Sequence, residues 1–200
     1  MKLSWIIVIP GFLLCTLVQA QKKFEAGLWL APVTSQVSGD GLGGWDKFGV
    51  SGGAWVRTRL NERWNITGGL QYTPKGSRTE QDTITFQTFG YYLNYIEMPI
   101  TAGYTLKQWE FQLGAMAGVL LNQEIRTNSV NVDVNPPFRS YEIGGVAGVM
   151  YSISEKLGVG VRFSSSILPV RPAPNFTNRF SYYERGNFNQ VVHFLLQYRF

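Results

Sequence analysis

Cysteine, charge and helical periodicity are all scarce in this 200-residue sequence. The single cysteine, Cys15, lies close to the N-terminus, and a lone cysteine excludes an internal disulfide framework. Charged residues make up 16% of the chain, well below the roughly 25% of an ordinary soluble domain. The formal net charge of +5 is too small to indicate a protein that binds nucleic acid.

Sequence motifs for cofactor chemistry are also missing. The chain has no metal-ligand spacing, no phosphate-binding loop and no nucleotide-binding fingerprint. We therefore expect no cofactor and no bound metal, and no nucleic acid among the partners.

The first twenty residues have the pattern of a cleaved signal peptide. A short basic start precedes an apolar run from Trp5 to Val18, and Ala20 supplies a small residue at the usual cleavage position. A membrane-spanning helix needs about 20 apolar residues, so an uncleaved anchor is the weaker alternative. We predict a signal peptide over residues 1–20 and one domain over residues 21–200 that contains no cysteine.

The longest regular pattern lies between Tyr91 and Leu121. Apolar and polar residues alternate there in two runs, which a short turn at residues 106–108 separates. Because successive side chains of a strand point to opposite faces, this alternation predicts two antiparallel strands with one apolar and one polar, glycine-rich face. The apolar face has aromatics toward its ends and smaller aliphatic residues in its middle, which is typical of a membrane-spanning barrel wall.

The same alternation recurs along the rest of the chain and predicts eight strands, over residues 24–30, 48–60, 64–75, 91–106, 109–121, 141–153, 157–167 and 188–200. Short turns are expected at residues 61–62, 106–108 and 154–156, and long loops at 32–46, 76–90, 122–137 and 168–186. Bacterial outer-membrane barrels have even strand numbers, short periplasmic turns and long extracellular loops. We therefore predict an all-β, eight-stranded antiparallel up-and-down transmembrane β-barrel in the bacterial outer membrane.

Alternation alone does not decide which face points outward, because a soluble lipocalin-type barrel would place the apolar face inside. The aromatics of the apolar face gather at both ends of the strands: Trp64, Tyr104, Trp109, Tyr151 and Tyr198 near the short turns, and Phe48, Tyr72, Tyr92, Tyr141 and Phe188 near the long loops. Such girdles, and a polar face rich in Gly, Ser, Thr and Gln, favour an apolar face in lipid and a narrow, packed lumen.

The C-terminal strand supports the same interpretation. It ends in Tyr198-Arg199-Phe200, and a terminal aromatic strand that ends in Phe resembles the recognition signal of the barrel-assembly machinery. Tyr198 and Phe200 are therefore the expected assembly signal.

Two segments of the strands have a distinctive sequence. Residues 69–76 read Gly-Leu-Gln-Tyr-Thr-Pro-Lys-Gly, and residues 93–100 read Leu-Asn-Tyr-Ile-Glu-Met-Pro-Ile. They resemble the PorT-like outer-membrane barrels, in which a strand ending in a Lys-Gly step precedes a Tyr-aliphatic-Glu-aliphatic-Pro motif. Ala102-Gly103 departs from the bulkier residues that are usual after this motif. The resemblance implies an outer-membrane location and, for the namesake of this heterogeneous family, a role in protein secretion.

Charged residues on the polar face are few and balanced in sign. Glu97 lies near the middle of its strand, where a carboxylate has to be paired or neutralised. The predicted lumen charge network consists of Arg57, Arg59, Lys75, Glu97, Glu110, Glu142, Arg162 and Arg199. A network that plugs the barrel is favoured over a proton or ion relay. Pro99, which lacks a ladder donor, suggests a local bulge.

His193 is the only histidine, and an acid–base role would need a nucleophile such as Ser164 or Ser166 on the neighbouring strand. Their parity points into the barrel and away from any lipid substrate, so we favour a structural histidine and predict no catalytic residue. A surface for an envelope protein partner or for lipid phosphates is expected in the last long loop, at Arg171, Arg179, Tyr182, Tyr183 and Arg185.

The combined patterns indicate a non-enzymatic envelope component, with a secretion accessory or scaffold role implied by the resemblance alone. The expected partners are outer-membrane lipid, the barrel-assembly machinery and an envelope protein. Two alternatives remain open: an enzyme that modifies outer-leaflet lipids, and a barrel whose long loops bind a ligand or mediate adhesion.

Overall fold

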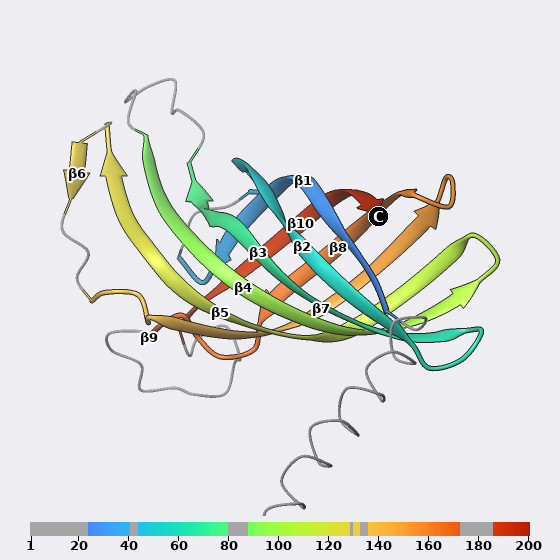
Figure 1. The fold of residues 1–200 in the computed structure, drawn as a ribbon. Helices are drawn as coiled ribbons and strands as arrows, with labels where there is room; N and C mark the ends of the chain where they lie inside the picture. Colours follow the sequence, from blue (N-terminus) through green and yellow to red (C-terminus); the bar gives the residue numbers. More distant parts are fainter. Residues whose placement is uncertain (1–23, 41–43, 80–87, 129, 133–135, 173–185) are drawn as a thin grey trace, which may run out of the picture.

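Figure 1 shows the computed structural model, which describes residues 24–40, 44–79, 88–128, 130–132, 136–172 and 186–200. Eight long antiparallel strands form the wall: β1 (Phe24–Ser38), β2 (Lys47–Arg59), β3 (Trp64–Arg78), β4 (Phe89–Leu106), β5 (Trp109–Thr127), β7 (Tyr141–Ser152), β8 (Leu157–Ser166) and β10 (Gly186–Arg199). Each long strand pairs with the next one along the chain, and β1 pairs with β10 to close the sheet. The predicted eight-stranded up-and-down barrel is therefore confirmed. The described residues include no helix of sufficient length and apolar character to cross a membrane.

Two very short strands add to this wall. β6 (Val130–Val132) extends the sheet beside the far end of β5, and β9 (Arg171–Pro172) pairs with the start of β10. Both lie at the end of the barrel where the long connections gather (Figure 1).

The three short turns lie at the opposite end of the barrel from the long connections (Figure 1). In the β2–β3 turn, the side-chain oxygen of Asn61 accepts hydrogen bonds from the backbone N–H groups of Arg63 and Trp64, at 2.9 and 2.8 Å. In the β7–β8 turn, Ser154 Oγ accepts one from Leu157 N at 3.1 Å. Such side-chain bonds replace ladder bonds where the chain reverses, which permits tight connections.

Several strands extend beyond the predicted boundaries. β1 continues to Ser38, β3 to Arg78 and β5 to Thr127, so the loops expected from residues 32, 76 and 122 begin later. Pro32 lies within β1 opposite Val50. The alternation of apolar residues ends where the wall leaves the bilayer, but backbone hydrogen bonds continue the ladder into water.

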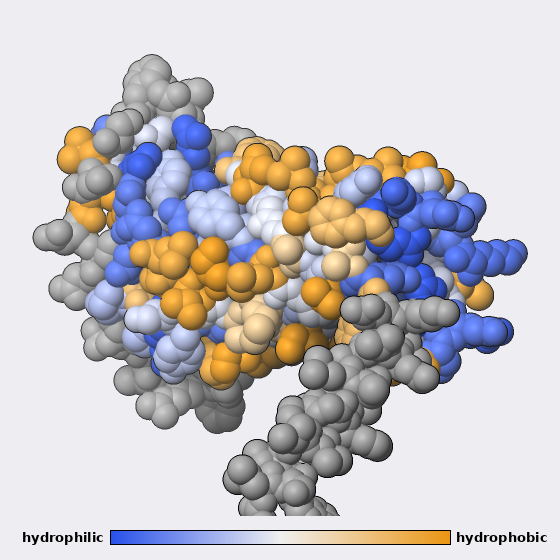
Figure 2. Space-filling model, in the orientation of Figure 1, coloured by the Kyte–Doolittle hydropathy of each residue, from blue (hydrophilic) through white to orange (hydrophobic). Residues whose placement is uncertain are grey.

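The apolar face points outward, as predicted. Leu113 on this face is 70% exposed, whereas polar side chains such as Gln71, Thr101 and Ser164 on the other parity are buried. Figure 2 shows hydrophobic side chains along the middle of the wall and hydrophilic ones toward both ends. This is the reverse of a soluble barrel, and it matches a wall immersed in lipid.

Aromatic pairs mark the periplasmic end of the wall. The rings of Trp64 and Tyr104 lie 5.0 Å apart, and those of Trp109 and Tyr151 lie 4.9 Å apart. One predicted member of the opposite girdle is wrong: Phe188, opposite Ser38 in the β1–β10 ladder, is 1% exposed. Phe188 lies on the outward-facing side of the strand. It is at the loop end of β10, however, where an outward-facing side chain can still be buried.

The predicted bulge at Pro99 is also wrong in its position. Pro99 stands opposite Met116 in a continuous part of the β4–β5 ladder, and the register shift lies between Asn94 and Tyr95. On the β3 side, the ladder is interrupted at Met98 and Pro99, because a proline nitrogen has no hydrogen to donate.

Candidate functional site

The extracellular half of the lumen contains a buried triad of Lys75 on β3, Glu97 on β4 and Glu142 on β7. Lys75 Nζ lies 2.5 Å from Glu97 Oε1 and 2.8 Å from Glu142 Oε1, and all three side chains are 0% exposed. Gln71 donates to Glu97 Oε2 at 2.9 Å, and Asn189 donates to Glu142 Oε2 at 2.7 Å. Each carboxylate thus has both a cation and an amide donor, which compensates for its removal from water.

The strand register explains how two carboxylates come to share one lysine. Gly118 on β5 stands opposite Glu97 on one side and Glu142 on the other. A Cβ at Gly118 would lie 3.3 Å from Glu97 Cγ, so a larger residue there would press on that side chain. The glycine leaves a gap between the two glutamates. Lys75 lies on β3, which pairs with β4, and its long side chain contacts Glu97 on that neighbouring strand and Glu142 on β7.

The periplasmic half contains a second set, the periplasmic-side cluster of Arg57, Glu110, Gln112 and Arg162. Arg57 holds Glu110 with two contacts of 2.9 Å, a bidentate pair, and its Nε donates to Thr67 Oγ1 at 3.0 Å. Gln112 donates to Glu110 Oε1 at 2.6 Å and accepts from Arg162 at 3.1 Å. The glutamine thus links the second arginine to the ion pair.

Apolar and aromatic side chains fill the lumen around these polar groups. The guanidinium carbon of Arg162 lies 4.4 Å from the ring centroid of Trp29, a cation–π contact. Trp29 belongs to a buried apolar cluster that also contains Ala31, Val33, Trp55, Met150, Val191 and Leu195. Across the described residues, the buried charges comprise three cations and three carboxylates, so their formal charges sum to zero.

The remaining two predicted network residues lie at the periplasmic mouth. Arg59 pairs with Glu25 at 2.6 Å, and Arg199 pairs with the same carboxylate at 3.1 Å. The side chain of Arg59 is 47% exposed. The eight predicted residues are therefore divided among the triad, the periplasmic-side cluster and this rim.

The prediction omitted four residues that complete these groups, namely Glu25, Gln71, Gln112 and Asn189. All four share the lumen parity of their strands, so parity was the signal that could have found them. A prediction from charge alone leaves out the three amides, which are polar but uncharged.

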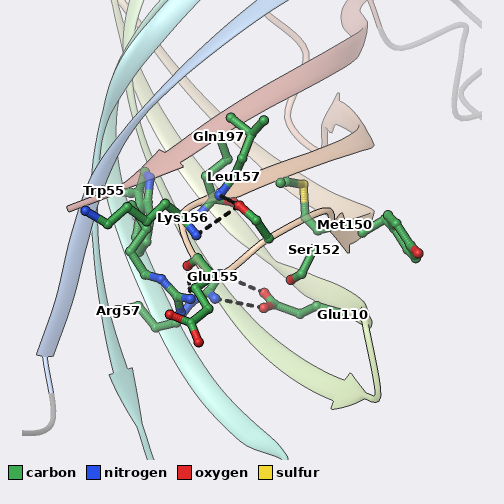
Figure 3. A pocket seen from close by; sticks show the side chains of 13 residues that line it. Trp55, Arg57, Glu110, Met150, Ser152, Glu155, Lys156, Leu157 and Gln197 are labelled. Carbon is green, nitrogen blue, oxygen red and sulfur yellow. Dashed lines mark hydrogen bonds and ion pairs between the residues drawn. The ribbon is translucent and has the colours of Figure 1, made fainter.

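A small cavity opens beside the periplasmic-side cluster (Figure 3). It has a volume of about 40 Å³, and Arg57 and Glu110 line it together with Glu155, Lys156 and Gln197. This is room for a few water molecules next to polar partners. Arg57 and Glu110 each have 9% of their side chain exposed, in contrast to the fully buried triad.

The extracellular end of the lumen is closed by an apolar cap. Val37, Tyr91, Leu93, Tyr95, Ile125, Phe138 and Val170 form one buried cluster. The rings of Tyr91 and Phe138 lie 5.5 Å apart in an edge-to-face arrangement. Phe138 and Val170 come from the long connections, which therefore fold back over the triad.

Arg171, a member of the predicted partner loop, takes part in this cap. Its Nε donates to the carbonyl of Pro136 at 2.8 Å, and its Nη1 donates to the hydroxyl of Tyr91 at 3.2 Å. The guanidinium also lies over the ring of Phe138, at 5.3 Å. The other predicted residues of that surface, Arg179, Tyr182, Tyr183 and Arg185, lie outside the described residues.

His193 lies in the lumen wall and is fully buried. Its Nε2 is 3.5 Å from Ser164 Oγ, a long contact, while Ser166 Oγ accepts a hydrogen bond from the backbone N–H of Asn189 at 2.7 Å. Within the described part of the chain, no group of three or more His, Cys, Asp or Glu side chains is placed to hold a metal ion. His193, Ser164 and Ser166 are thus all buried inside the barrel.

Residues 19–170 match the family model described as outer membrane protein beta-barrel domain. The chain belongs to this family of outer-membrane β-barrels. No curated protein matches the sequence.

Solved structures of the same barrel type are similar to this one in fold. Ail, the attachment invasion locus protein of Yersinia pestis, is 14% identical, with 89% of this chain and 99% of that chain covered and a TM-score of 0.50. Neisserial surface protein A is 15% identical over 88% and 97% of the two chains, with a TM-score of 0.49. OprG from Pseudomonas aeruginosa is 12% identical over 88% and 94%, with a TM-score of 0.38. At such identities the likeness to Ail concerns the fold alone.

Family and fold together establish an integral β-barrel of the bacterial outer membrane. In this barrel the expected assembly signal lies at the periplasmic end of β10. The rings of Tyr198 and Phe200 lie 6.0 Å apart, and both residues are exposed. Phe200 N donates to the carbonyl of Ala26 at 3.0 Å, so the terminal residue continues the ladder that closes the barrel.

Proposed function

We propose that this barrel is a non-enzymatic, non-conducting component of the outer membrane that acts through its extracellular surface as an accessory or scaffold for an envelope protein machine. The observation that carries the proposal is the filled lumen. An apolar cap, a sealed triad and the periplasmic-side cluster follow one another along the barrel axis. An eight-stranded barrel is just wide enough for side chains to fill it, so its outer surface and loops are what remain for interaction.

The absence of catalysis is supported by the placement of the reactive groups. His193 and Ser164 are buried in the lumen, at a separation of 3.5 Å and away from the lipid face. A lipid-modifying enzyme needs its nucleophile and base within reach of the substrate. Five of the six buried charges lie in ion pairs, and the sixth, Arg162, is linked to Glu110 through Gln112. This arrangement favours a plug over a proton or ion relay.

The secretion role rests on the PorT-like segments at residues 69–76 and 93–100. The structure gives these segments a physical meaning, because Lys75 and Glu97 from the two segments form one buried ion pair. In this proposal the surface for an envelope protein partner includes Arg179, Tyr182, Tyr183 and Arg185. The barrel-assembly machinery recognises Tyr198 and Phe200, and residues 1–20 are removed as a signal peptide, so that N-terminal sequencing of the mature protein begins at Gln21.

A gene deletion tests the function. We expect the deletion strain to lose secreted protein while its lipid A composition and adhesion remain normal. Complementation with Arg179→Ser/Arg185→Ser should fail to restore secretion, whereas Arg63→Ser/Lys156→Ser, which removes the same charge from the periplasmic turns, should restore it. Altered lipid A with normal secretion would instead indicate an enzyme, and lost adhesion alone would indicate an adhesive barrel.

A further inference from the structure

Basic side chains gather on the outer face of the wall at the extracellular ends of β3, β4 and β5. Arg78 on β3 stands opposite Gly90 on β4, and Gly90 stands opposite Arg126 on β5. Directly opposed residues of neighbouring strands share a face, so the two arginines flank a position that has no side chain. Figure 2 shows hydrophilic side chains over these strand ends.

The glycine leaves a hollow between the two arginines. This cavity has a volume of about 90 Å³ and is lined by Arg78, Thr88, Phe89, Gly90, Tyr92 and Arg126. A Cβ at Gly90 would lie 3.1 Å from the carbonyl oxygen of Ser77 and 3.2 Å from the ring of Tyr92. A larger residue would therefore crowd the floor and fill part of the hollow.

Positive charge predominates around the hollow. The guanidinium carbon of Arg126 lies 4.6 Å from the ring centroid of Tyr92, and Lys47 Nζ lies 4.9 Å from the same ring. Glu124, which pairs with Arg126 at 2.5 Å, is the one carboxylate that contacts these three cations among the described residues. Arg78 has no acidic partner within that part of the chain.

The cations are close enough to disfavour one another. Lys47 precedes Phe48 of the outer girdle and so lies outside the membrane-spanning part of β2. Its burial, and then the charges of Arg126 and Arg78, lower the pKa of its amino group. An anion between these groups would relieve the repulsion.

The position of the hollow indicates where that anion comes from. Tyr72 and Tyr92 belong to the aromatic girdle at the extracellular end, and the apolar wall of Met98 and Ile100 lies below them on the same face. Girdle aromatics mark the level of the lipid head groups. An anion at this outward face is therefore part of the outer leaflet.

We infer that the hollow between Arg78 and Arg126 binds a phosphate group of an outer-leaflet lipid. Two guanidinium forks match the oxygens of a phosphate, and the ring of Tyr92 holds one of them in place. The site lies on the membrane-facing wall, so it is independent of the scaffold role and of the partner loop.

Native mass spectrometry of the full-length mature barrel in phosphatidylcholine nanodiscs tests the inference, with three probes: phosphorylated lipid A, enzymatically dephosphorylated lipid A and inorganic phosphate. The phosphorylated lipid should bind and the other two should not. Arg78→Gln and Arg126→Gln should each weaken its binding roughly tenfold, since each removes a charge-assisted hydrogen bond. Gly90→Leu should weaken it by filling the hollow.

Arg63→Gln is the matched control, because it removes the same charge from an exposed turn at the periplasmic end. It should leave lipid binding unchanged, and heat-modified gel mobility verifies that every variant is folded. Equal binding of phosphorylated and dephosphorylated lipid A would overturn the inference. Binding of inorganic phosphate as tight as that of phosphorylated lipid A would also overturn it. So would an equal loss of lipid binding in Arg63→Gln and Arg78→Gln.

Discussion

The triad and the periplasmic-side cluster both pair a cation with glutamate inside the lumen, but their surroundings differ. In the triad, one lysine serves two glutamates with no exposed surface beneath an apolar cap. In the periplasmic-side cluster, Arg57 and Glu110 form a bidentate pair that borders a cavity of about 40 Å³ (Figure 3). A buried charge without a partner is far more costly than a hydrated one. Removal of a partner should therefore lower the free energy of unfolding more in the triad than in the periplasmic-side cluster. One end of the lumen is sealed, and the other borders a small cavity at the periplasmic mouth.

Removal of the triad lysine should have the largest effect. Lys75→Met leaves two carboxylates in a site without water, and it should lower the free energy of unfolding by about 3–5 kcal/mol. Denaturant unfolding in lipid vesicles, followed by gel mobility, measures this change. The triple variant Lys75→Met/Glu97→Gln/Glu142→Gln should recover most of the loss, because it removes all three charges together. If the triple variant were no more stable than Lys75→Met, repulsion between buried carboxylates would not be the cause.

A new charge on the other side of the wall should have the next largest effect. Ile100→Arg places a cation on the lipid face near mid-membrane, which should cost roughly 2–4 kcal/mol of folding free energy in a bilayer. Thr101→Asn at the adjacent, lumen-facing position is the control and should change stability little. Comparable losses in both variants, measured in the same vesicles, would contradict the assignment of the two faces.

Loss of the periplasmic-side arginine should be milder than loss of Lys75. Arg57→Met breaks the bidentate pair, but water from the adjacent cavity reaches Glu110, so we expect a loss of about 1.5–3 kcal/mol. The same unfolding experiment gives the value. A loss equal to or larger than that of Lys75→Met would remove the proposed difference between the two halves of the lumen.

The rim should contribute least. Arg59→Gln removes an exposed partner of Glu25, and exposed ion pairs contribute about 0–1 kcal/mol. High salt should remove most of the difference between this variant and the wild type, since mobile ions screen exposed charges. A salt-insensitive loss of several kcal/mol would mean that the rim is as dry as the triad.

The sequence predicted the wall better than the lumen. Alternation identified the eight strands, the face that contacts lipid and the position of each short turn. It missed the outer parts of β1, β3 and β5, where backbone pairing continues without an apolar pattern. Parity also predicted which charges face inward, but it did not predict their depth along the barrel axis.

The depth of the lumen charges and the choice of their partners depend on how the barrel closes, and no local sequence pattern predicts this. Lys75 reaches Glu142 on a strand that lies 67 residues away along the chain. Arg171 was predicted on a partner surface, and in the structure it packs on Tyr91 and Phe138 in the cap. The basic and aromatic character of that loop can be read from its composition. The pairing of its two ends, β9 with the start of β10, cannot.

Planar-bilayer recording tests the central claim, that the lumen is a filled plug, most directly. Purified barrel inserted into a bilayer should give little or no stable conductance, because the apolar cap and the triad leave no continuous water path. Lys75→Met should not open a steady channel either, since the cap remains in place. Large, steady channels from the pure wild-type protein would contradict the account.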